Sequence, residues 1–268
     1  MLDAHPAFMA LAVMLGAGAL TWLLSVVKQD VSIVDSLWPL LFVLGALAYA
    51  ADGGRYGGSG RTALAGALLA IWALRLCIHI TWRNWGEDED RRYRAIRARN
   101  QPGFAWKSLY LVFALQAVLA WVIAMPVFAI IGSRAPIGLV DCLGVALWLV
   151  GFGFESAGDW QLARFKADAA NRGRVLDSGL WRYTRHPNYF GEATQWWGFY
   201  LLAAAGGAWW TLFAPLLMTF LLLRVSGVSL LEKDIGERRH GYRDYVARTS
   251  VFVPWPPKAH APHAGDAA

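Results

Sequence analysis

The chain has 268 residues, of which 57% are hydrophobic, with a formal net charge of +6 and a mean hydropathy of +0.36. This composition is too apolar for an ordinary soluble domain, so we expect an all-α, polytopic integral membrane protein. The net positive charge is expected to reflect membrane topology, and it is not interpreted as a nucleic-acid footprint.

Seven apolar runs, taken in chain order, predict a bundle of about seven transmembrane helices, since a bilayer core takes about 20 apolar residues as helix. The runs cover roughly residues 6–27, 37–51, 62–82, 108–131, 137–157, 189–206 and 208–231. The first run lacks a basic leader and an obvious cleavage site, so it is expected to be retained. We predict one domain over residues 1–257 and a disordered tail over 258–268.

The distribution of basic residues predicts the orientation of the chain. With the N-terminus outside, 20 of the 25 Lys and Arg residues fall on inside segments and three fall on outside loops. This bias predicts a cytoplasmic C-terminus, in a bacterial inner membrane. A cavity between such helices could open to the cytosol.

Polar residues recur at helical spacing on four of the runs, near their predicted cytosolic ends. They are Arg75, His79 and Arg83 on the third run, Glu155, Asp159 and Lys166 on the fifth, Asn188, Glu192 and Gln195 on the sixth, and Arg224 and Glu232 around the seventh. Because each set shares one helix face, we predict a polar cavity facing the cytosol. The alternative is that these side chains only snorkel to the interface and pair with each other.

Three predicted cytosolic loops are rich in arginine: "EDEDRRYRAIRAR", "KADAANRGR" and "WRYTRHP". Pro187 suits the first turn of a helix, which would bring the positive helix end beside Arg185 and His186. This loop is expected to bind an anionic cofactor, while Asn188 and Glu192, one turn further, meet its uncharged head. The alternative is a positive-inside loop with no ligand.

Several site classes are not supported by the sequence. Cys77 and Cys142 lack metal-ligand spacing, so neither a disulfide framework nor a metal site is expected. No G-x-G-x-x-G follows a predicted strand, which excludes a Rossmann domain. A bound dinucleotide would therefore lie in the membrane bundle itself.

The segments "ESAGDWQLARFK", "GLWRYTRHPNYFGEATQWWGF" and "LLEKDIGERRHGYRDYVARTSVFVPWPP" resemble the steroid 5-alpha-reductase family, in particular its bacterial membrane branch, DUF1295. The similarity covers about residues 30–257 and is strongest over 155–257. It implies a seven-helix enzyme that uses NADPH to reduce the carbon–carbon double bond of an enone, typically a 3-oxo-Δ4 steroid.

The resemblance also implies site residues. Those implied for the cofactor are Asp159, Lys166, Arg174, Asn188, Glu192, Arg224 and Glu232, with Arg92 and Tyr93 on the adenosine-phosphate side. The family's carboxylate corresponds to Asp35, whereas Ile80, beside His79, stands where the family has a tyrosine. We therefore expect Asp35 to hydrogen-bond the substrate carbonyl, with His79 as donor or relay. The alternatives are a helix N-cap for Asp35 and a packing role for His79.

The expected ligands follow from this interpretation. The apolar enone would enter from the lipid and NADPH from the cytosol, and the many arginines favour NADPH over NADH. A second interpretation is a membrane methyltransferase of the isoprenylcysteine or phospholipid type, which shares a basic "RHPxY" entry to a helix hairpin and uses S-adenosylmethionine. A third is a transporter or scaffold without a soluble cofactor.

Overall fold

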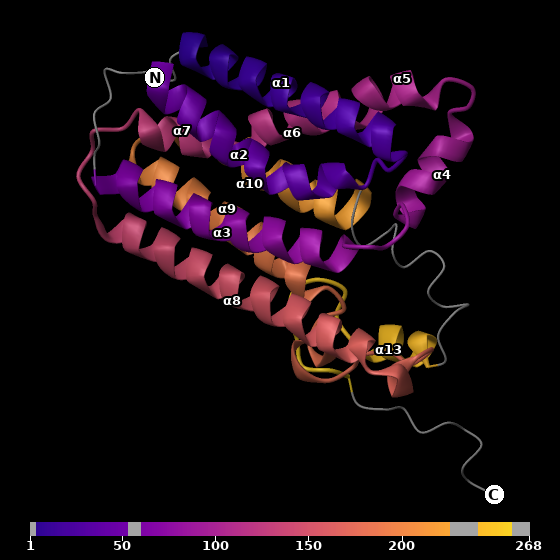
Figure 1. Ribbon diagram of the computed structural model, residues 1–268. Helices are drawn as coiled ribbons and strands as arrows, with labels where there is room; N and C mark the ends of the chain where they lie inside the picture. Colours follow the sequence, from indigo (N-terminus) through magenta and orange to yellow (C-terminus); the bar gives the residue numbers. More distant parts are fainter. Residues whose placement is uncertain (1–3, 53–59, 226–240, 259–268) are drawn as a thin grey trace, which may run out of the picture. The chain divides into compact units, whose positions relative to one another are not determined.

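The computed structural model describes residues 4–52, 60–225 and 241–258, and the longer elements in these ranges are all helices (Figure 1). They are α1 (Ala4–Lys28), α2 (Ile33–Asp52), α3 (Gly60–Asn84), α4 (Arg91–Arg99), α5 (Phe104–Ser108), α6 (Leu115–Ile123), α7 (Met125–Ile131), α8 (Leu139–Ala167), α9 (Pro187–Ala205), α10 (Phe213–Phe220) and α13 (Tyr242–Arg248). Short π-helical segments at Leu109–Ala114 and Leu221–Val225 continue α5 and α10. The predicted all-α class is confirmed.

Five helical stretches are long and apolar enough to cross a membrane: Ala4–Lys28, Ile33–Ala51, Gly60–Asn84, Phe104–Ile123 and Leu139–Ala167. They correspond to the first five predicted runs, which supports a membrane helical bundle. The sixth run forms α9, which begins at Pro187 as the loop chemistry predicted. The seventh run is described only as far as Val225, where Trp209–Val225 is a shorter apolar helix.

Two helix boundaries differ from the apolar runs. The run 108–131 is not one helix, because α6 ends at Ile123 and α7 begins at Met125, with Pro126 in its first turn. Proline lacks the N–H that a continuous helix would need at this position. Helix α8 continues ten residues beyond the predicted end at 157, because its polar last turns are helix-forming although they are not apolar.

The described residues form two compact units, and each is described by itself. Unit 1 comprises Met1–Gly144 with Phe199–Ala214, and unit 2 comprises Val145–Gly198 with Pro215–Ala268. Helices α8 and α9 each contribute to both units. The predicted tail 258–268 lies, except for Lys258, outside the described residues.

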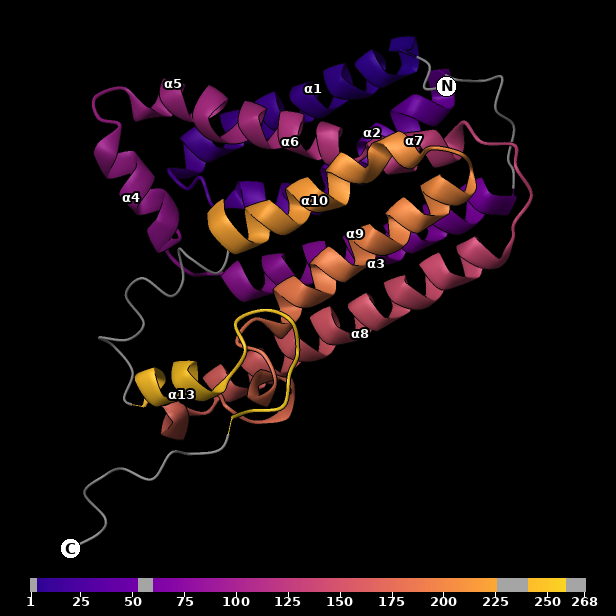
Figure 2. The same cartoon turned by 180° about the vertical axis from the view of Figure 1, so that it is seen from behind.

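In unit 1, helix α2 packs against both α1 and α3, and α6 lies beside α1 and α2 (Figures 1 and 2). Aromatic rings fill this core: Tyr49 stacks on Phe128 with centroids 4.9 Å apart, and Phe42 meets Trp72 edge-on at 5.4 Å. A further buried cluster of Val31, Val34, Tyr93, Phe104, Val112 and Phe113 holds α4 and α5 against the bundle. This cluster fixes the position of Tyr93.

A buried ion pair closes the opposite end of unit 1. Arg61, at the start of α3, donates to both carboxylate oxygens of Asp141, at the start of α8, over 2.6 and 2.8 Å. The same guanidinium donates to the Oγ of Ser133 and to the carbonyls of Ala135 and Pro136. Both charged side chains are only 1% exposed, and these hydrogen bonds take the place of those that water would make to the buried charges.

Candidate functional site

In unit 2, α8 and α9 approach so closely at two glycines that their backbones touch. A Cβ on Gly191 would lie 2.4 Å from the backbone nitrogen of Glu155 and 2.5 Å from the carbonyl oxygen of Gly151. A Cβ on Gly151 would meet the carbonyl of Gly191 at 2.6 Å. Because no larger residue fits, these glycines set the distance between the polar faces of the two helices.

Polar side chains bridge α8 and α9 on both sides of this crossing. The amide of Gln195 donates to the Oε2 of Glu155 over 2.6 Å, and the amide of Asn188 donates to the Oδ1 of Asp159 over 3.1 Å. The side chains of Glu155, Asp159 and Gln195 are buried, as is that of Glu192. The two polar faces predicted from spacing therefore face each other.

Two buried side-chain amide oxygens of α9 remain available as hydrogen-bond acceptors. Within the described ranges, no donor reaches the Oδ1 of Asn188 or the Oε1 of Gln195. A buried acceptor without a donor is costly, and a ligand with an N–H group would satisfy it. A primary carboxamide, such as that of a nicotinamide, has the donor chemistry that these two oxygens need.

The basic loop before α9 is hydrogen-bonded to the C-terminal segment of unit 2. The Nη1 of Arg185 donates to the carbonyls of Val246 and Thr249, each over 3.1 Å, and its backbone N–H donates to Ser250 over 2.9 Å. The Oγ1 of Thr184 donates to the carbonyl of Phe252 over 2.8 Å. Arg185, predicted as a cofactor ligand, thus has a structural role at the end of α13.

The other predicted cofactor residues of unit 2 differ in exposure. His186 is buried and its ring stacks on that of Tyr189, with centroids 5.5 Å apart. The cations Lys166, Arg174 and Arg224 are exposed, as groups that meet phosphates from solution need to be. Glu232 lies outside the described residues. The cofactor assignments of these residues stay predictions.

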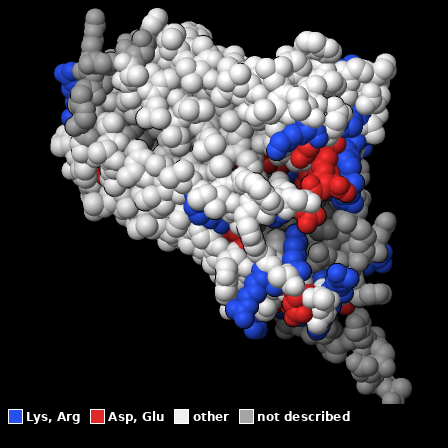
Figure 3. All heavy atoms as spheres, in the orientation of Figure 1, with Lys and Arg blue, Asp and Glu red and all other residues white. Residues whose placement is uncertain are grey.

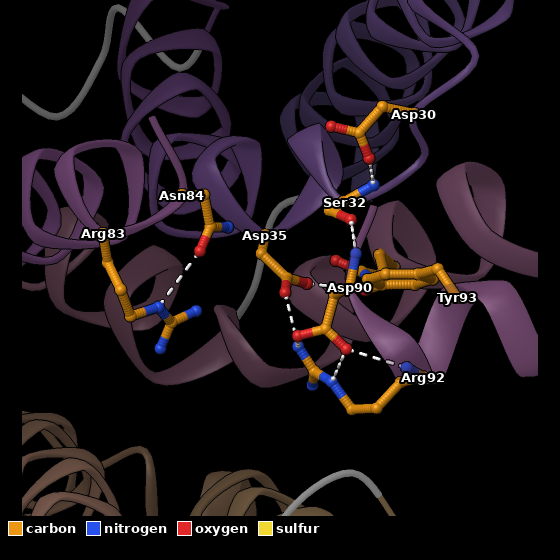
Figure 4. A network of polar contacts seen from close by, with 9 residues as sticks. Asp30, Ser32, Asp35, Arg83, Asn84, Asp90, Arg92 and Tyr93 are labelled. Carbon is orange, nitrogen blue, oxygen red and sulfur yellow. Dashed lines mark hydrogen bonds and ion pairs between the residues drawn. The ribbon is translucent and has the colours of Figure 1, made fainter. Parts of the chain in front are cut away.

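In unit 1, the carboxylate of Asp35 lies between two side chains of α4 (Figure 4). The Oη of Tyr93 donates to the Oδ1 of Asp35 over 2.5 Å, and the Nη2 of Arg92 donates to the Oδ2 over 2.7 Å. The side-chain amide of Gln116 donates to the Tyr93 hydroxyl over 3.2 Å. Asp35 lies in the first turn of α2, two residues after its start. Its carboxylate accepts hydrogen bonds from side chains of α4 instead of capping its own helix.

A helix cap and two further hydrogen bonds place α4 beside the start of α2. Asp90 is the N-cap of α4 and accepts from the backbone N–H of Arg92 over 2.8 Å. The backbone N–H of Asp90 donates to the Oγ of Ser32, whose own N–H donates to Asp30 (Figure 4). The first turns of the two helices are thereby linked, which brings the inner face of α4 to Asp35.

Burial and charge shift the pKa values of this group. Burial, followed by the nearby charge of Asp35, raises the pKa of Tyr93 well above its ordinary value. Burial would lower the pKa of Arg92, but attraction to Asp35 and the hydrogen bond to Asp90 raise it overall. Tyr93 therefore stays protonated, and Arg92 stays charged, over any physiological pH.

Asp35, Arg92 and Tyr93 were all predicted as site residues, but their contact with one another was not. Asp35 was expected to act with His79, but its partners among the described residues are Arg92 and Tyr93; the ring of His79 lies 6.2 Å from that of Trp82. Arg92 and Tyr93 were expected beside an adenosine phosphate. The available signal was Asp90 before "RRYRAIRAR", which marks a capped helix with Tyr93 in its first turn.

Comparison with known proteins identifies the family. Residues 21–249 match the family model described as "Protein of unknown function (DUF1295)". The chain is 27% identical over 265 residues to "Uncharacterized protein C594.04c" of Schizosaccharomyces pombe, covering 88% of this chain and 76% of that protein. No solved structure matches the chain. Since the family model spans most of the chain, the protein belongs to the DUF1295 family, the steroid 5-alpha-reductase-like membrane proteins.

Proposed function

We propose that this protein is a membrane-embedded, NADPH-dependent reductase that saturates the carbon–carbon double bond of an enone such as a 3-oxo-Δ4 steroid. The observation that carries the proposal is the contact of the Tyr93 hydroxyl with Asp35, 2.5 Å apart at the buried inner face of α4. The proton of this phenol is now accepted by Asp35, and it would pass to a substrate carbonyl oxygen that displaces this carboxylate beside the apolar bundle.

The chemistry explains the choice of groups. Reduction of an enone adds a hydride to the β-carbon, and negative charge develops on the carbonyl oxygen before the α-carbon takes a proton. Tyr93 has one hydroxyl proton, which Asp35 accepts, so Tyr93 would donate to such an oxygen only when that oxygen replaces Asp35 as its acceptor; Arg92 has five N–H donors and can donate to a further oxygen. Asp35 accepts from both of them, so its role is to orient the donors. This assignment gives the donor role to Tyr93, where Asp35 or His79 had been expected from the sequence alone.

The cofactor is assigned to unit 2. The acceptor oxygens of Asn188 and Gln195 fit the carboxamide of a nicotinamide, and Glu192 lies one helical turn from Asn188. Lys166, Arg174 and Arg224 are exposed cations that suit its phosphates. NADPH, when bound, supplies the hydride. Exclusion of water by the apolar helices would protect the reaction.

The membrane setting assigns the route of the substrate. An apolar enone partitions into lipid and would reach the bundle sideways, whereas the charged cofactor would come from the cytosol. The proposal places the protein in a bacterial inner membrane with the N-terminus outside and the C-terminus in the cytoplasm. Reporters fused after Ala268 and inserted at Gly58 should report the cytoplasm and the opposite side, respectively.

The activity is tested with the purified full-length protein in detergent. NADPH should bind more tightly than NADH, and its absorbance should fall when a 3-oxo-Δ4 steroid is added, with the saturated ketone found by mass spectrometry. NADPH binding without reduction of any enone in a panel would reject the substrate class. Transfer of a labelled methyl group from S-adenosylmethionine, without NADPH binding, would replace the proposal by the methyltransferase interpretation.

A further inference from the structure

Gln116 is a polar side chain inside an apolar, membrane-spanning stretch. It lies in α6, within the stretch Phe104–Ile123, which is long and apolar enough to cross a membrane. The surface over the long helices is largely uncharged (Figure 3). A polar side chain in such surroundings is costly unless it is hydrogen-bonded, and it is a candidate for a functional role.

The chain around Gln116 contacts Tyr93 at two places. Val112 and Phe113, in the π-helical segment before α6, belong to the same buried cluster as the Tyr93 ring. Gln116, in the first turn of α6, donates its side-chain amide to the Tyr93 hydroxyl over 3.2 Å. Short π-helical segments in helices are frequent at functional sites. One stretch of chain thus holds both the ring and the hydroxyl of Tyr93.

The two hydrogen bonds of the Tyr93 hydroxyl use different parts of the group. Its single proton is donated to Asp35, and one lone pair of its oxygen accepts from Gln116. When a substrate carbonyl displaces Asp35, the proton turns to a new acceptor, but the lone pair bonded to Gln116 is not involved. The hydrogen bond from Gln116 can therefore persist while the acceptor of the proton changes.

We propose that Gln116 is the positioning residue of Tyr93: it holds the phenol oxygen in place while the hydroxyl proton turns from Asp35 to the carbonyl oxygen of the substrate. Burial raises the pKa of Tyr93, and the hydrogen bond from Gln116 opposes this rise, which makes the hydroxyl a better donor. The inference rests on the proposed reductase function, because it assigns a role within that reaction.

The test uses Gln116→Glu in the full-length protein in detergent. A protonated carboxyl can donate to the phenol oxygen as the amide does, whereas an ionised carboxylate can only accept and competes for the Tyr93 proton. Enone turnover by Gln116→Glu, relative to the parent, should therefore rise by about tenfold as the pH falls from about 8 to about 5. Gln116→Leu, which has no donor, should be about tenfold slower than the parent at every pH. The Kd for NADPH should stay within about twofold of the parent value in both variants.

The charged side chains beside the hydroxyl are the same in every variant. They are Asp35 and Arg92, with Asp90 next to Arg92. A pH response confined to Gln116→Glu therefore belongs to the introduced carboxyl, and a purely structural role of Gln116 would not produce it. A ratio of Gln116→Glu turnover to parent turnover that is constant with pH overturns the proposal.

The matched control is Ser108→Ala, which removes a polar group from the same stretch. The Oγ of Ser108 donates to the carbonyl of Ala105 in its own helix, so this variant should reduce the enone like the parent. Unfolding temperatures in detergent show whether each variant is folded. If Gln116→Glu does not fold, Gln116→Leu decides, and parental turnover by Gln116→Leu overturns the proposal.

A second measurement does not depend on turnover. 3-Fluorotyrosine at position 93 reports the hydrogen bonds of its hydroxyl by ¹⁹F NMR, and its resonance should move with pH in Gln116→Glu but not in Gln116→Leu. If the resonance moves but the parent reduces no enone, the reductase function is rejected together with the role of Gln116 in it, although the contact stands. If the parent reduces the enone and the resonance of Gln116→Glu does not move, only the positioning role is rejected.

Discussion

The hydroxyl of Tyr93 lies 2.5 Å from the carboxylate of Asp35, although 58 positions separate the two residues in the chain. One residue comes from the first turn of α2 and the other from the first turn of α4. Their contact exists because Asp90, the N-cap of α4, donates its backbone N–H to Ser32, which directly precedes α2. The hydroxyl group that donates to Asp35 therefore comes from the short helix α4 and not from one of the long helices.

Replacing Tyr93 by Phe removes the hydroxyl with little change in volume. We expect turnover of an enone to fall by about 10²–10⁴-fold while NADPH binding is retained, because a general acid acts mainly in the transition state. The rate is measured as NADPH oxidation under saturating cofactor. The control is Tyr110→Phe, an exposed tyrosine that should leave the rate unchanged. If Tyr93→Phe reduces the enone at the parental rate, Tyr93 is not the proton donor, and His79 or water takes that role.

Glu192→Gln tests the cofactor side. Glu192 is buried one turn from Asn188, and a carboxylate accepts more strongly than an amide from a carboxamide or ribose hydroxyl. The Kd for NADPH, measured by fluorescence titration, should rise by about tenfold, which corresponds to about 1.4 kcal/mol. Asp244→Asn, a change of the same kind at an exposed position of α13, should bind like the parent. An unchanged Kd for Glu192→Gln would show that this residue does not bind the cofactor.

The crossing of α8 and α9 is tested by Gly191→Ala. The added methyl would meet backbone atoms at 2.4 and 2.5 Å, so the helices must separate and the contact of Gln195 with Glu155 must lengthen. We expect NADPH binding to be lost and the unfolding temperature in detergent to fall. Gly153→Ala is the control, because a Cβ at Gly153 meets nothing within 4 Å and alanine favours the helix. Equal stability of the two variants would contradict the close crossing.

The ion pair of Glu89 with Arg97 predicts a pH dependence of stability. Burial would raise the pKa of Glu89, but hydrogen bonds from Arg97 and from the Val31 N–H lower it overall. A carboxyl whose pKa is lower in the folded state stabilises the fold above its unfolded pKa, and this contribution is lost as the pH falls through the folded value. The difference in unfolding temperature between the parent and Glu89→Gln should therefore shrink below about pH 4. A constant difference from pH 7 to 3 would reject this pairing.

The pair of Arg61 with Asp141 should matter for folding and not for chemistry. Asp141→Asn leaves a buried guanidinium without its counter-charge, which costs about 3–5 kcal/mol. The variant should show a much lower unfolding temperature in detergent. The double variant Arg61→Met/Asp141→Leu removes both charges and should recover much of that loss. If the single variant matches the parent in stability, the pair contributes nothing to the fold.

Periodicity predicted what depends on local sequence. Apolar runs located the five long helices, and Pro187 marked the start of α9. The spacing of Asp159 and Asn188 predicted a polar cavity, with pairing of the side chains as the alternative, and in the structure Asn188 donates to Asp159. Contacts between distant segments were not visible in this way. Neither the bond of Tyr93 to Asp35 nor that of Arg185 to α13 leaves a periodic signal, because each joins an irregular loop or a short helix to another element.

The fastening of the loop before α9 to residues 245–255 has a consequence for biosynthesis. Tyr183, Thr184 and Arg185 all form hydrogen bonds with backbone groups of this segment, which is synthesised after α9. Unit 1 consists mostly of earlier residues and can assemble while synthesis continues. The loop at the entrance to α9 can take its final form only after the C-terminal segment has left the ribosome. A nascent chain halted at Gly241 would already contain α9, yet it would lack the bonds that hold the loop leading into it.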